Sequence, residues 1–126
     1  MFLFILKNYK KQKKRVVIAG NGGSSSIASH VSVDFAKVAG VPSSTFNNAN
    51  LITCFANDYG YENWVVKALE FYAEPNDLLV LISVSGESLN LVNAVKYAKK
   101  YSIETLSITG FNKLNSLNSL TKYSLW

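Results

Sequence analysis

The stretch that most constrains this chain is a glycine- and serine-rich turn that follows an apolar run. The run is Arg15–Ala19, the turn is Gly20-Asn21-Gly22-Gly23-Ser24-Ser25-Ser26, and residues 27–39 then have helical composition. Such a strand–turn–helix unit is typical of an anion site, because backbone N–H groups at a helix start lack intrahelical partners. Glycines also let the backbone approach a phosphate closely. From this stretch alone, a phosphate cradle and a plain turn capped by Ser24 or Ser25 are equally good interpretations.

Composition favours one globular domain. Of the 126 residues, 48% are hydrophobic and 17% are charged, which suits a single core and argues against disorder. The net charge of +5 reflects a basic cluster between Lys7 and Arg15. A nucleic-acid surface is one interpretation of this cluster. We favour the other, a solvated helix end before the first strand, and expect no nucleic-acid partner.

The single cysteine and the apolar N-terminus bear on location. Cys54 stands alone, which excludes an internal disulfide and fits a reducing environment. Met1–Leu6 is too short to span a membrane and precedes its charges, the reverse of the order in a signal peptide. We therefore expect a cytoplasmic protein with no membrane partner.

Helical patterns and apolar runs alternate along the chain. They predict helices over 2–14, 24–39, 49–57, 62–73, 89–100 and 113–120, and strands over 15–19, 44–46, 78–82, 104–108 and 123–126. This alternation predicts an α/β fold with a mainly parallel sheet. The chain stops at Trp126 inside an apolar run. We therefore expect a C-terminally truncated chain or one that relies on a partner.

A second small-residue loop follows the strand that ends at Ile82. It carries hydroxyls on Ser83, Ser85 and Ser88 and leads into the next helix. Because neighbouring parallel strands end at the same crevice, both loops are expected to meet at one ligand. Neither loop reads GxGxxG, and the second has no P-loop lysine, so a small anion such as a sugar phosphate is favoured and no nucleotide cofactor is expected. The alternative is that Ser88 only caps its helix.

His30 and Asp34 lie four residues apart on the first of these helices, so their side chains share a face. An imidazole and a carboxylate can bind Zn²⁺ or exchange protons. A catalytic zinc site normally takes three protein ligands, however, and a surface contact is the commoner meaning of such a pair. The polar segment at residues 57–60, taken alone, is a loop between helices.

Together these segments resemble the SIS (sugar isomerase) domain, and within it the phosphoheptose isomerase-like branch. The matching segments are GNGGS at 20–24, His30 at its distance from that turn, FANDYGY at 55–61 and ISVSGES at 82–88. The resemblance covers roughly residues 15–120. It implies a three-layer α/β/α sandwich with a five-stranded, mainly parallel sheet. Residues 1–14 are then an N-terminal helical remnant, and residues 15–126 are the phosphosugar-binding domain.

The resemblance also implies an activity and a set of site residues. The activity is aldose–ketose isomerisation of sedoheptulose 7-phosphate through an enediol, in a dimer or tetramer. The residues expected at the sugar and its phosphate are Asn21, Gly22, Gly23, Ser24, Asn57, Asp58, Ser83, Val84, Ser85 and Ser88. His30 and Asp34 correspond to zinc ligands, with Asp34 as the candidate base and His30 as a ligand or acid.

Some positions depart from the family pattern. Asp34 replaces a glutamate, Val84 a threonine and Glu87 an asparagine. The Glu87 charge beside a phosphate loop is unfavourable unless it points away. The chain also ends before the helices that supply a glutamine and a histidine, so we expect weak or no isomerase activity. Three interpretations stay open: an isomerase, a non-catalytic phosphosugar-binding or regulatory module, and a fragment that cannot fold alone.

Overall fold

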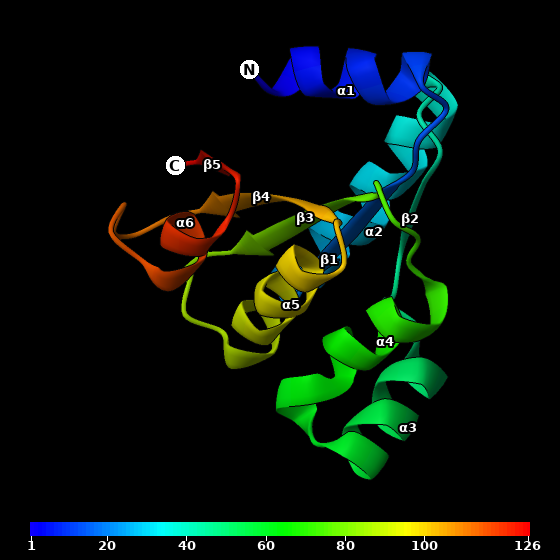
Figure 1. The fold of residues 1–126 in the computed structure, drawn as a ribbon. Helices are drawn as coiled ribbons and strands as arrows, with labels where there is room; N and C mark the ends of the chain where they lie inside the picture. The colour runs from blue at the N-terminus through cyan, green and yellow to red at the C-terminus, as the bar shows by residue number, and fades with distance from the viewer.

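A computed structural model describes residues 1–126 (Figure 1). The helices are α1 (Phe2–Lys11), α2 (Gly23–Asp34), α3 (Ala49–Tyr59), α4 (Trp64–Tyr72), α5 (Leu89–Lys100) and α6 (Ser116–Leu120). The strands are β1 (Val16–Gly20), β2 (Ser43–Thr45), β3 (Leu78–Ser83), β4 (Glu104–Thr109) and β5 (Tyr123–Leu125). A π-helical turn, Phe35–Ala39, extends α2, and a 3₁₀ turn, Tyr61–Asn63, precedes α4. Every helix and strand expected from the sequence is present.

The five strands form one parallel sheet in the order β2-β1-β3-β4-β5. From β1 the chain crosses to β2 on one side and later returns to β3 on the other. The strand order therefore reverses between β1 and β3, and open α/β sheets bind ligands at such a reversal. In register, Gly20 at the end of β1 lies beside Ile82 near the end of β3, so the two loops begin next to each other.

Helices cover both faces of the sheet, which confirms the three-layer α/β/α sandwich. In Figure 1, α1 lies across the top of the molecule, and α3 and α4 form a hairpin at the opposite end. One apolar cluster joins α1 and α2 to Val16 and Ile18, and the other joins α3, α4, α5 and α6 to Val17 and Ala19. Successive strand side chains point to opposite faces, so the continuous apolar run of β1 serves both clusters.

Local chemistry sets the helix ends that differ from expectation. The first helix ends at Lys11 rather than at residue 14, and Lys13 takes a positive φ of 54° in the turn that follows. The last helix begins at Ser116 rather than at 113, because the Asn115 side chain caps it by accepting a hydrogen bond from Asn118 N. Asn48 caps α3 in the same way. None of the helices combines the length and apolar character needed to cross a membrane.

The N-terminal helix is fixed to the sheet by its apolar face and by one polar cluster. Ile5, Leu6 and Tyr9 are buried in the α1–α2 core. The Tyr9 hydroxyl donates to Glu104 Oε2 at 3.0 Å, and Lys122 pairs with the other carboxylate oxygen. Partial burial raises the pKa of Glu104, but the Lys122 and Tyr9 hydrogen bonds outweigh it, so the pKa is lowered overall.

We predict that Glu104→Gln destabilises the protein at neutral pH by about 1 kcal/mol, since the pair is partly exposed and one charged hydrogen bond is lost. The lowered folded-state pKa means that the unfolded chain binds the proton more readily. The stabilisation is thus complete above the unfolded value near pH 4.3 and disappears as pH falls through the folded value. Urea unfolding of both proteins between pH 3 and 7 measures the difference. Glu74→Gln is the control, and an equal deficit for Glu104→Gln at every pH contradicts the prediction.

Candidate functional site

The first wall of the site is the turn between β1 and α2. Gly20 is required there, because a Cβ at this position would lie 2.8 Å from the Ser24 backbone and side chain. Gly22, at φ 54°, is the N-cap residue, and α2 begins at Gly23. No side chain caps this helix, so the interpretation in which Ser24 or Ser25 caps it is wrong. Ser24 N, Ser25 N and Ser26 N donate to the backbone oxygens of Asn21 and Gly22. The helix start therefore offers an anion the Gly23 N–H and the positive end of the helix dipole.

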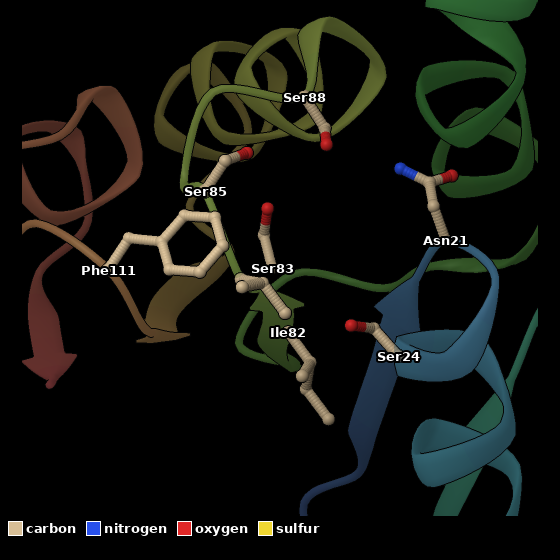
Figure 2. A pocket seen from close by; sticks show the side chains of 8 residues that line it. Asn21, Ser24, Ile82, Ser83, Ser85, Ser88 and Phe111 are labelled. Carbon is tan, nitrogen blue, oxygen red and sulfur yellow. The ribbon is translucent and has the colours of Figure 1, made fainter.

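The second wall is the loop between β3 and α5. The Ser83 hydroxyl accepts a hydrogen bond from Gly86 N at 3.1 Å, and the Ser85 hydroxyl accepts one from Glu87 N at 3.2 Å. Ser88 is the N-cap residue of α5, but its side chain bonds to no helix N–H. The interpretation that Ser88 only caps its helix is therefore wrong. Figure 2 shows its hydroxyl on the side of the loop that faces the cavity.

The two walls enclose one cavity of about 300 Å³ (Figure 2). Its lining is Asn21, Ser24, Ile82, Ser83, Val84, Ser85, Ser88 and Phe111. The expected meeting of the two loops is thus confirmed, and six of the expected site residues line the cavity. No basic side chain lines it. Hydroxyls, an amide and the positive ends of the α2 and α5 dipoles are what it offers to a bound anion.

Phe111 is a lining residue that sequence reasoning missed. It lies just after β4, in the loop that follows the strand adjacent to β3, and its φ is 43°. The rule that neighbouring parallel strands end at one crevice applies to β4 as well. Applied there, it would have placed the loop after Thr109 at the site. Figure 2 shows the Phe111 ring beside Ser85 and Ser83, where it presents an apolar face to the cavity.

The Glu87 carboxylate points away from the cavity and fixes the serine loop to α6. It accepts hydrogen bonds from Ser116 N at 2.9 Å and from Ser116 Oγ at 2.5 Å, and these bonds lower the pKa of Glu87. Leu117 N also donates to Gly86 O at 3.0 Å. The carboxylate is therefore held in its charged form at the start of α6, on the side of the loop that does not line the cavity.

His30 and Asp34 form a pair outside the cavity. Their Nε2 and Oδ2 atoms are 3.3 Å apart, with side chains 80% and 50% exposed, and neither lines the cavity. The chain contains no group of three His, Cys, Asp or Glu side chains placed to hold a metal ion. These two donors alone do not fit a zinc site, which needs at least one further ligand.

Asn57 and Asp58 also lie outside the cavity. They are exposed on the last turn of α3, where Asn57 Nδ2 donates to Asp58 Oδ1 at 2.9 Å. The residue of this segment that reaches the site is Tyr61, whose hydroxyl donates to Asn21 Oδ1 at 3.0 Å. Asn90, in the first turn of α5, also bonds to the Asn21 amide, and sequence reasoning missed it together with Phe111 and Tyr61.

Comparison with known proteins agrees with this arrangement. The phosphoheptose isomerase of Buchnera aphidicola is 32% identical over 125 residues, covering 94% of this chain and 64% of that protein. The phosphoheptose isomerase of Fusobacterium nucleatum is 36% identical over 110 residues, covering 83% of this chain and 57% of that protein. The structure of phosphoheptose isomerase GmhA from Neisseria gonorrhoeae superposes with a TM-score of 0.82 at 26% identity, covering 94% of this chain and 64% of that one.

The chain thus spans less than two thirds of the length of these relatives. The family model described as the SIS domain matches residues 4–110, which include β1, β3, β4 and both loops of the cavity. Because this match takes in most of the chain and every lining residue of the cavity except Phe111, the chain belongs to the SIS domain family.

Proposed function

We propose that this chain binds a sugar phosphate between β1 and β3 and acts as a phosphoheptose isomerase on sedoheptulose 7-phosphate. The observation that carries the proposal is the cavity itself. Two helix N-termini and three serine side chains of the β3–α5 loop converge on it, and no cation lines it. Fixed dipoles and hydroxyls suit a small phosphate, whereas a nucleotide triphosphate normally needs a lysine and a metal ion.

The lining gives the ligand a direction. We place the phosphate against Ser83, Ser85 and Ser88 at the start of α5, where hydroxyls and the helix dipole combine. The sugar then extends toward Asn21 and Ser24 on the opposite wall. The proposed substrate is supported by similarity to phosphoheptose isomerases over most of the chain.

The candidate acid–base residues do not line the cavity of a single chain. Asp34 remains our candidate base and His30 our candidate acid or zinc ligand, but both lie outside the chain's own cavity. We propose that they act where a second copy of the chain, in a dimer or tetramer, brings in a further cavity and further ligands. A cytoplasmic location is part of the proposal and suits the exposed free thiol of Cys54.

The second candidate is a phosphosugar-binding module without catalysis. The placement of His30 and Asp34 favours it, because no titratable side chain lines the cavity. Isomerisation needs a base that removes the proton beside the carbonyl, whereas binding needs only the two loops. The two candidates therefore predict the same ligand and differ in turnover.

Binding is tested by calorimetric titration with sedoheptulose 7-phosphate. We predict that Ser88→Ala weakens binding about tenfold or more, because it removes a hydroxyl that has no partner within the protein and would bond a charged phosphate. Ser26→Ala, an exposed position on α2 outside the cavity, is the control and should bind like the parent. Equal affinity of the Ser88→Ala and parent proteins would disprove the phosphate orientation. Absence of binding by the parent would disprove the function.

Turnover separates the two candidates. We expect the 126-residue chain to bind sedoheptulose 7-phosphate and to convert it slowly, with or without added Zn²⁺, because it supplies only two of the ligands and no base in the cavity. The aldose phosphate is measured by chromatography. Asp34→Asn should abolish any residual conversion while leaving the dissociation constant unchanged. Conversion that survives Asp34→Asn removes Asp34 as the base, and binding with no conversion favours the non-catalytic module.

A further inference from the structure

The Asn21 side chain is held by hydrogen bonds to two residues that do not themselves line the cavity. Asn21 Nδ2 donates to Asn90 Oδ1 at 3.0 Å, and Asn90 Nδ2 donates back to Asn21 Oδ1 at 2.9 Å. The Tyr61 hydroxyl donates to the same Asn21 oxygen at 3.0 Å. A primary amide has two N–H donors and two acceptor positions on its oxygen. Both acceptor positions and one donor are therefore engaged, and one N–H of Asn21 is free.

The amide nitrogen of Asn21, which carries the free N–H, lies on the cavity side. Figure 2 shows the amide nitrogen of Asn21 on the side of Ser88 and Ser83, with the oxygen turned away from them. Asn90 is only 2% exposed. A buried amide left without partners is costly, so the reciprocal pair fixes the plane in which the Asn21 amide lies.

The two supports come from different parts of the fold. Asn90 belongs to the first turn of α5, directly after the serine loop, whereas Tyr61 belongs to the 3₁₀ turn that joins α3 to α4. The Tyr61 ring packs against Trp64, with ring centroids 6.4 Å apart. Trp64 is buried in the core, so the hydroxyl approaches Asn21 from an anchored ring.

We propose that Asn90 and Tyr61 are positioning residues that aim the free Asn21 N–H at an oxygen of the sugar part of the ligand. This proposal rests on the proposed sugar-phosphate site. With the phosphate against the serine loop, Asn21 on the opposite wall meets the sugar. A donor already held in place loses little entropy when the ligand binds and stabilises negative charge on that oxygen.

The test compares two ligands, sedoheptulose 7-phosphate and inorganic phosphate, by calorimetric titration. Tyr61→Phe removes only the hydroxyl and should weaken the sugar phosphate about three- to tenfold, as expected for one hydrogen bond, while leaving inorganic phosphate unchanged. Tyr59→Phe is the matched control, since the Tyr59 hydroxyl makes no hydrogen bond to the protein and Tyr59 lies outside the cavity. Asn90→Ala removes both hydrogen bonds between Asn90 and Asn21 without adding a charge and should produce the larger loss. Melting temperatures identify variants that fail to fold.

A double-variant cycle asks whether Tyr61 acts through Asn21. Adding Tyr61→Phe to Asn21→Ala should cause no further loss of sugar-phosphate affinity. The proposal is overturned if Tyr61→Phe binds the sugar phosphate like the parent, if both ligands weaken equally, or if the two losses add. Failure of the parent to bind either ligand removes the proposed function and this inference together. Binding of both ligands by the parent, with no effect of Tyr61→Phe, removes this inference alone.

Discussion

The pairing of β1 with β3 is the contact on which the rest of the structure depends. Both strands are buried on each face, and their register runs from Val16 beside Leu78 to Gly20 beside Ile82. This register places the carboxyl ends of β1 and β3 at the same level, so the two loops begin side by side at that end of the sheet. A slip of one residue would turn every core side chain of β1 to the other face, so packing specifies the site geometry as strongly as it specifies the fold.

Most of the fold was predictable because each element has a local signal. The apolar runs of β1, β3 and β4 are found where the sequence placed them. The boundaries that moved depend on single turns. A capping side chain such as Asn115 competes with helical extension, and only the assembled structure shows which one prevails.

The site was predictable to the extent that it follows from strand ends. Asn21, Ser24 and the serine loop needed only the rule that parallel strands end at one crevice. To predict which side chains of a helix face the site, their angles around the helix axis must also be considered. At about 100° per residue, His30 is about 120° around α2 from Ser24 and Asp34 about 80°, so neither shares the face on which Ser24 meets the cavity. Tyr61 and Asn90 could not be recognised, because their roles depend on contacts between segments distant in sequence.

The attachment of the serine loop to α6 has a consequence for how sequence change acts on this protein. The loop is held from outside the cavity by Glu87, which bonds to Ser116, and by Gly86, whose carbonyl accepts from Leu117. Gly86 also has no room for a side chain, since a Cβ would overlap Asn115. Residues 115–117 thus hold the serine loop in place from outside the cavity. A substitution in residues 115–117 can therefore change the shape of the cavity while every residue that lines it stays the same.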